Sequence, residues 1–137
     1  MTQPEIAHAH FQHRLEVETD ADDVGSAIVD GTADFILLDA RSPAAYVAAH
    51  LQGAVSLPHR GITAETLDEL GDGPIVVYCW GPGCNAATKA CAKIVALGRD
   101  DVKEMLGGFE YYVREGWPVE GEQAYAADDR GLVGLPT

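Results

Sequence analysis

The chain is poor in basic residues, in cysteine and in long hydrophobic runs. Its 137 residues include nine lysines and arginines against 22 aspartates and glutamates, and the formal net charge at pH 7 is −13. This surplus of negative charge argues against nucleic acid and anionic membrane surfaces as partners. No apolar stretch approaches the roughly 20 residues of a transmembrane helix, and the N-terminus lacks the apolar run of a signal peptide. We therefore expect neither a nucleic-acid partner nor a membrane partner.

Cysteine is scarce and odd in number. Three cysteines without an export signal indicate free thiols in a reducing compartment rather than a disulfide framework, so we expect a cytoplasmic protein. Residues 1–14 contain three histidines but no cysteine or carboxylate at ligand spacing. We expect no metal there and interpret this segment as a loosely helical or disordered lead-in.

Apolar residues make up 47% of the chain, which is enough for one globular domain. Hydrophobic patterns and capping residues predict strands at 15–18, 35–39, 75–78 and 102–106, and helices at 20–30, 43–47, 63–70, 86–97 and 109–115. Strands that alternate with helices favour an α/β fold with a mostly parallel sheet. We assign residues 15–121 to this domain and interpret 122–137 as a polar tail.

One cysteine occupies a position suited to chemistry. Cys79 directly follows the strand-like run at 75–78 and opens a loop that leads into a helix. Ligands bind at the carboxyl ends of parallel strands, and such a loop brings N–H groups and the positive helix end towards the sulfur. The helix alone should lower the thiol pKa by about one unit. We predict that Cys79 is a nucleophile; the alternative is a small buried apolar residue at a strand end.

The rest of the loop is expected to bind the substrate. Gly81 and Gly83 are interpreted as positions that let N–H groups turn inward, and Pro82 as a residue that stiffens the loop. Trp80 either covers the pocket or packs the loop down. Cys84 either forms a disulfide with the nucleophile, resolving a persulfide or a sulfenate, or has no chemical role. The predicted substrate-binding loop comprises Trp80, Gly81, Pro82, Gly83, Cys84 and Asn85.

Few cations are available to contact an anionic substrate. Arg41, which follows the strand ending at Asp39, is one candidate, and His59 and Arg60 after a proline turn are two others. The alternative for Arg41 is a structural tie between the strand end and a neighbouring loop. For the other two it is a solvated loop. Cys91 lies on the apolar stripe of the helix that follows the cysteine loop, so we expect it in the core.

Three stretches, in order and at sensible spacing, together resemble the rhodanese-like (sulfurtransferase) domain family. DARSPAAY and HLQGAVSLP, within 39–58, resemble its D-x-R…[FY]…H-I-x-G-A-x-x-[IL]-P signature. The strand and loop at 76–85 resemble its cysteine loop, and GGF…GWPV within 107–119 is similar to its closing segment. The resemblance implies a three-layer α/β fold with a five-stranded, mainly parallel sheet flanked by helices, and Cys79 as the sulfur carrier.

The chain departs from the family pattern at two places. Cys84 stands where many active members carry an arginine, so a common anion-binding cation is missing. Ala44 and Ala45 replace two acidic residues, which should leave Arg41 without its usual carboxylate partner. The loop also lacks the arginine clamp and the length of the phosphatases that share this fold, which argues against phosphoryl chemistry.

The resemblance implies a sulfurtransferase that requires no metal or organic cofactor. Cys79 would take a sulfane sulfur from thiosulfate or a persulfide and pass it to a thiol or cyanide. Two other functions remain open. The missing arginine and the acidic chain favour a low-turnover sulfur-carrier or signalling module that binds a protein donor or acceptor. The two loop cysteines favour a redox switch through a Cys79–Cys84 disulfide.

Overall fold

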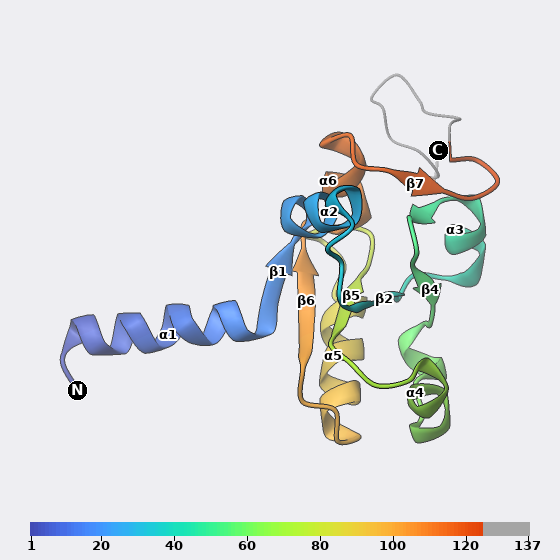
Figure 1. Ribbon diagram of the computed structural model, residues 1–137. Coiled ribbons are helices and arrows are strands. Elements are labelled where there is room, and N and C mark those ends of the chain that lie inside the picture. The colour runs from blue at the N-terminus through green and yellow to red at the C-terminus, as the bar shows by residue number, and fades with distance from the viewer. Residues whose placement is uncertain (125–137) are drawn as a thin grey trace.

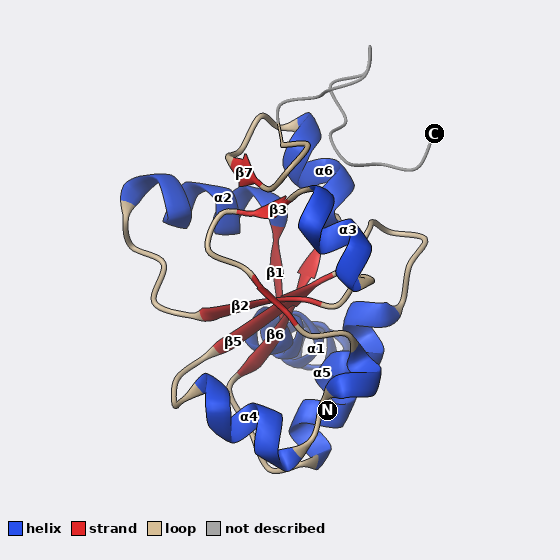
Figure 2. Cartoon of the chain, turned by 90° about the vertical axis from the view of Figure 1, so that its right-hand side faces the viewer, coloured by secondary structure: helices blue, strands red, loops and turns tan. Residues whose placement is uncertain are grey.

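The computed structural model describes residues 1–124. They form three layers, with a parallel sheet between two layers of helices (Figures 1 and 2). In spatial order the sheet contains β1 (Glu18–Asp20), β6 (Val102–Leu106), β5 (Ile75–Tyr78), β2 (Ile36–Asp39) and β4 (Val55–Ser56). Every neighbouring pair runs parallel. The predicted α/β fold with a five-stranded sheet is confirmed.

Helices cover both faces of the sheet because the central strand is apolar on both sides. Val76 and Tyr78 of β5 pack into one cluster with α2 (Ala21–Asp30) and α6 (Gly108–Arg114). Ile75 and Val77 pack into the other, with α4 (Ala64–Leu70) and α5 (Ala86–Ala96). This period-two separation is what a strand between two helical layers requires. The core therefore lies on both sides of β5, and its carboxyl end is held from both faces.

The predicted helix limits in the first half of the domain follow from local caps. The carboxylate of Asp20 accepts from the N–H of Asp23 at 2.8 Å and starts α2. Gly31, with φ of 72°, ends it in the left-handed conformation that glycine adopts at low cost. Ser42 caps α3 (Pro43–Ala48), and a reciprocal pair of hydrogen bonds between Thr63 and Thr66 starts α4.

The N-terminal segment differs from the prediction. Residues Gln3–Val17 form helix α1, which buries none of its side chains and projects from the body of the domain (Figure 1). The predicted strand at 15–18 is wrong for its first three residues, because the sheet begins only at Glu18. The ion pair between Arg14 and Glu18, at 2.9 Å, spans the last turn of the helix and supports it up to the strand.

A second, two-stranded sheet was not predicted from the sequence. β3 (His50–Leu51) pairs antiparallel with β7 (Val119–Glu120), close to α3. Of the predicted tail, residues 122–124 fold against α3, where the N–H of Gln123 donates to the carbonyl of Ala48 at 2.7 Å. The remainder of the tail lies outside the described residues. None of the helices within residues 1–124 is both long and apolar enough to cross a membrane.

Candidate active site

Cys79 lies at the carboxyl end of β5, in the middle of the sheet, with 4% of its surface exposed. Its thiol donates to the carbonyl of Cys84 at 3.1 Å. The first turn of α6 fixes the start of the loop, since Phe109 N–H donates to the carbonyl of Cys79 and Glu110 N–H to that of Trp80, both at 2.8 Å. The strand and α6 together therefore set the position of the sulfur.

Close backbone approach explains one glycine beside the loop, Gly108. A Cβ on Gly108 would lie 2.7 Å from both the Cys79 carbonyl oxygen and the Gly81 nitrogen, and its φ is +65°. A Cβ on Gly81 would lie 2.9 Å from a carboxylate oxygen of Glu110. Neither Gly81 nor Gly83 has a positive φ, and open space surrounds Gly83. A side chain at Gly81 would require only the flexible end of Glu110 to move, and nothing in the structure requires glycine at Gly83.

A cavity of about 390 Å³ opens beside Cys79. One wall is the predicted loop, of which Gly81, Pro82, Cys84 and Asn85 line the cavity. The other wall was not predicted: it consists of Thr88 on α5 and residues 104–108 at the end of β6. Thr88 Oγ1 donates to Glu104 Oε1 at 2.6 Å across it. Because β5 and β6 are parallel neighbours, their carboxyl ends meet at this edge of the sheet. The second wall of the cavity could therefore be predicted only from the order of the strands, which local sequence patterns do not give.

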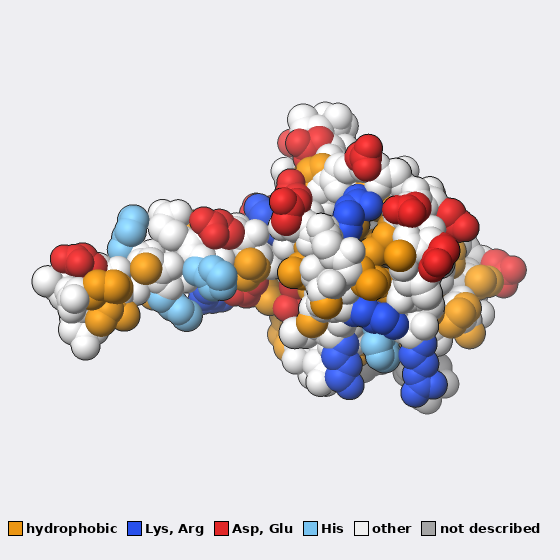
Figure 3. All heavy atoms as spheres, turned by 90° about the horizontal axis from the view of Figure 1, so that it is seen from below, with side chains coloured by type: hydrophobic (Ala, Val, Ile, Leu, Met, Phe, Trp, Pro, Cys, Tyr) orange, Lys and Arg blue, Asp and Glu red, His pale blue; other side chains and the backbone are white. Residues whose placement is uncertain are grey.

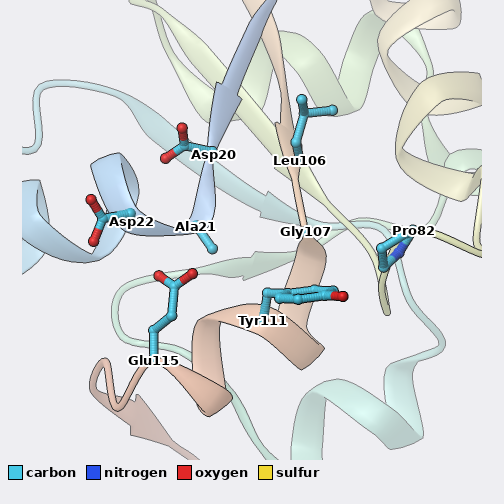
Figure 4. Close-up of a pocket in the computed structure, with 8 residues that line it drawn as sticks. All are labelled: Asp20, Ala21, Asp22, Pro82, Leu106, Gly107, Tyr111 and Glu115. Carbon is cyan, nitrogen blue, oxygen red and sulfur yellow. The ribbon is translucent and has the colours of Figure 1, made fainter.

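An adjoining cleft of similar size shares Pro82, Leu106 and Gly107 with this cavity (Figure 4). Its remaining lining comprises Asp20, Ala21, Asp22, Tyr111 and Glu115. Three of these five side chains are carboxylates, contributed by β1, α2 and the residue that caps α6. The approach to the loop from this side is therefore acidic.

The pKa of Cys79 is not lowered as predicted. Burial raises the pKa of this thiol to about 11, and the neighbouring thiol of Cys84 adds to the shift. The backbone N–H groups of Ala87 and Gly81 donate to the sulfur and oppose this, but they do not outweigh the loss of water. The N–H of Cys84 is not available to the sulfur, because it donates to the Gly81 carbonyl at 3.0 Å.

The pKa of Cys84 is shifted in the opposite direction and is lowered. Burial opposes it, but the N–H of Ala86, the thiol of Cys79, the N–H of Trp80 and the charge of Lys89 together lower the pKa of Cys84. The two thiols interact directly, and a negative charge on the pair falls more readily on Cys84 than on Cys79. The third cysteine, Cys91, packs against the core as predicted, and burial raises the pKa of its thiol to about 12.

Arg41 forms a structural tie and does not reach the cavity. Its side chain is completely buried, and Nη2 donates to Asp39 Oδ2 at 2.7 Å. The guanidinium also stands over the rings of Trp80 and Phe109, 4.5 and 4.2 Å from their centroids. Asp39 therefore supplies the carboxylate partner that the alanines at 44 and 45 seemed to remove. Trp80 packs the loop down against Phe109 and does not line the cavity.

His59 and Arg60 also lie outside the cavity lining. Both belong to the short 3-10 helix η1 (His59–Gly61), which packs against α5, and Lys93 Nζ donates to the carbonyl of His59 at 3.1 Å. Basic side chains gather on one part of the face shown in Figure 3, while acidic ones lie elsewhere on it. The structure thus separates these two residues from Cys79, and Lys93 of α5 contacts the short helix that holds them.

The chain is an α/β domain whose central parallel strand is followed by a cysteine, a short loop and a helix, and the cysteine lies where parallel sheets bind their ligands. A family model described as "Rhodanese-like domain" matches residues 20–115, and the chain belongs to this family.

Named relatives and solved structures agree. The chain is 34% identical over 88 residues to "Thiosulfate sulfurtransferase GlpE" of Pseudomonas fluorescens (strain Pf0-1), covering 64% of this chain and 78% of that one. It is 28% identical over 102 residues to a "Sulfurtransferase" of Allochromatium vinosum, covering 74% and 92%. The crystal structure of the BH2092 protein from Bacillus halodurans superposes with a TM-score of 0.85 at 40% identity and covers 92% of each chain.

Proposed function

We propose that this protein is a sulfurtransferase in which Cys79 carries a sulfane sulfur as a persulfide. The observation that carries the proposal is the position of Cys79 in a rhodanese-like domain: it ends the central strand, borders a cavity and receives N–H groups from Gly81 and Ala87. The names of the relatives support thiosulfate as a donor. The three free cysteines fit the reducing, cytoplasmic location that we propose.

The raised pKa of Cys79 requires that its proton leave before attack. The N–H groups of Gly81 and Ala87 favour the thiolate that this loss of the proton produces. The Cys79 thiolate then forms a bond to the outer sulfur of thiosulfate, the sulfur–sulfur bond of the donor breaks, and sulfite leaves with the electron pair. Each N–H donor to the anionic sulfur contributes roughly 1.5–3 kcal/mol. A thiol or cyanide next attacks the outer sulfur of the persulfide and restores Cys79, so no metal or organic cofactor takes part.

Release of sulfite tests the proposal, because it reports the first step alone. Mixing the reduced protein with thiosulfate should release about one sulfite per chain in a rapid phase. Cys79→Ser should release none, whereas Cys91→Ser, which removes a thiol on the core side of α5, should behave as the unmodified protein. Sulfite release that survives in Cys79→Ser would refute the proposed nucleophile.

A second candidate is a sulfur-carrier module that docks on a protein partner. Lys89 on α5 influences the loop thiol of Cys84, and Lys93 follows one turn later beside η1 with Arg60. None of the ion pairs found within residues 1–124 involves these three cations. On an otherwise acidic chain, such a surface favours a donor or acceptor protein with an acidic face.

Salt and charge reversal distinguish the carrier module from an enzyme that uses free thiosulfate. If an acidic protein is the donor, Lys93→Glu should slow sulfur transfer from it severalfold at low salt, while Arg14→Glu on the projecting helix should not. Rapid saturable turnover of free thiosulfate, with no faster protein donor, would exclude the module.

A further inference from the structure

We infer that Cys84 is a second reacting thiol: it attacks the Cys79 persulfide, expels hydrosulfide and leaves a Cys79–Cys84 disulfide. The inference rests on the proposed function, because it needs the persulfide on Cys79. It adds an activity that sulfur transfer alone does not include, namely reductive release of sulfide at the expense of a dithiol.

The geometry of the loop places the two sulfurs together. The N–H of Cys84 donates to the carbonyl of Gly81 at 3.0 Å, and this turn folds the loop back on itself. The Cys79 thiol in turn donates to the Cys84 carbonyl at 3.1 Å, and the two thiols interact directly. Both line the same cavity. The two cysteines that would form the disulfide are therefore neighbours within one loop and on one cavity.

Access favours Cys84 over a thiol from solution. Cys79 is 4% exposed, whereas Cys84 is half-buried, lies at the cavity wall and needs no entry step. A group held beside its target reacts as if present at a very high local concentration. An external acceptor must compete with this intramolecular attack for each persulfide that forms.

Charge also favours this thiol as the attacking group. The N–H groups of Ala86 and Trp80 and the ammonium of Lys89 stabilise the thiolate form of Cys84. The rate of thiol–disulfide exchange depends on the fraction of thiolate at the working pH and on the quality of the leaving group. Cys91, with a pKa of about 12 and a place on the core side of α5, has neither the charge nor a position on the cavity wall.

The attack of Cys84 on the persulfide needs no oxidant, because the persulfide itself accepts the two electrons. The Cys84 thiolate forms a bond to Cys79 Sγ, and the bond between Sγ and the outer sulfur breaks. The outer sulfur leaves with the electron pair and, after taking up one proton, is hydrosulfide. The two cysteines are oxidised by two electrons and the sulfane sulfur is reduced by two. A dithiol reductant must then reduce the disulfide before a second cycle.

A single-turnover experiment on the full chain tests this inference. The fully reduced protein, freed of added thiol, is mixed with thiosulfate, and sulfite, hydrosulfide and intact mass are measured together. We expect about one sulfite and one hydrosulfide per chain and a final mass lower by two hydrogens. Cys84→Ala should release sulfite but no hydrosulfide, and should gain one sulfur atom. Cys91→Ala, the matched control, should behave as the unmodified protein.

The outcomes separate the two proposals. If the unmodified protein releases sulfite and keeps the added sulfur, Cys84 does not resolve the persulfide, and the proposed sulfurtransferase stands alone. Hydrosulfide release that persists in Cys84→Ala would likewise overturn the role of Cys84. If neither sulfite nor added sulfur is found in any variant, no persulfide forms and both proposals fail.

Discussion

Three buried polar residues behind the loop form one unit. Tyr78 OH donates to Asp39 Oδ2 at 2.7 Å and accepts from the N–H of Leu51 at 3.1 Å, and Asp39 in turn binds Arg41. All of these groups are removed from water, so each depends on the others for hydrogen bonds. The unit joins β5, β2 and the segment after α3, and its arginine packs beneath Trp80 at the start of the loop.

Tyr78→Phe should therefore destabilise the domain. The substitution keeps the ring but leaves the Leu51 N–H without the hydroxyl that accepts from it and removes one of the donors to Asp39 Oδ2, which costs about 1–3 kcal/mol in the free energy of unfolding. Urea denaturation followed by circular dichroism would measure this. The control is Tyr111→Phe on the exposed face of α6, which should change stability by less than about 0.5 kcal/mol. Equal stability of the two variants would contradict the role of the unit.

The three thiols should react with iodoacetamide in a fixed order as pH rises. Only the thiolate reacts, and each pH unit below the pKa reduces its fraction tenfold. Cys84, with its lowered pKa, should be modified first near neutral pH. Cys79 and Cys91, with pKa values of about 11 and about 12, should follow only at alkaline pH. Peptide mass mapping across pH 6–10 would measure the order, and modification of Cys79 before Cys84 would contradict the assignment of charge within the pair.

At the scale of secondary-structure elements, the loop depends on α6 as much as on α5. Helix α6 reaches the loop through its first turn, where Gly108 leaves no room for a side chain between α6 and the Cys79 carbonyl. The helix that follows the loop supplies N–H groups to the thiols, whereas α6 determines where the loop lies.

Gly108→Ala should displace the loop and abolish most of the sulfite release. Gly116→Ala is the matched control: both residues have positive φ, at +65° and +85°, but a Cβ at 116 meets nothing within 4 Å. Both variants should lose about 1 kcal/mol of stability from backbone strain. Only Gly108→Ala adds a clash, worth roughly 1–3 kcal/mol. Normal sulfite release by Gly108→Ala would show that the contact does not position Cys79.

Helix α1 should be the least protected element of the domain. It buries no side chain, and its 15 residues are close to the length of about 12–15 residues below which isolated helices are marginal in water. Hydrogen exchange should therefore replace the amides of 6–16 within seconds to minutes while those of β5 stay protected. Protection of α1 equal to that of β5 would indicate that the helix is covered in solution.

At the scale of the whole molecule, the sequence predicted those parts of the fold that depend on local residue patterns. The fully apolar run of β5, the helices at 20–30 and 63–70 and the loop that begins at Cys79 were predicted from neighbouring residues alone. The β3–β7 pair could not be, because strands of two residues carry no period.

Long-range packing accounts for the other differences. The cavity wall containing Glu104 depends on the order of the strands, and the partner of Arg41 depends on how its buried side chain folds back onto Asp39. The raised pKa of Cys79 follows from burial, which the loop sequence does not reveal. Sequence patterns thus placed Cys79 at the end of the central strand, but the direction of its pKa shift depends on the whole fold.

The most direct test of the central claim is to locate the sulfane sulfur in the Cys84→Ala protein, where no second loop thiol can remove it. After brief exposure to thiosulfate, peptide mass spectrometry should find one extra sulfur atom on the peptide that contains Cys79, and cyanide should remove it. An unchanged Cys79 peptide, or extra sulfur on Cys91 instead, would contradict the account.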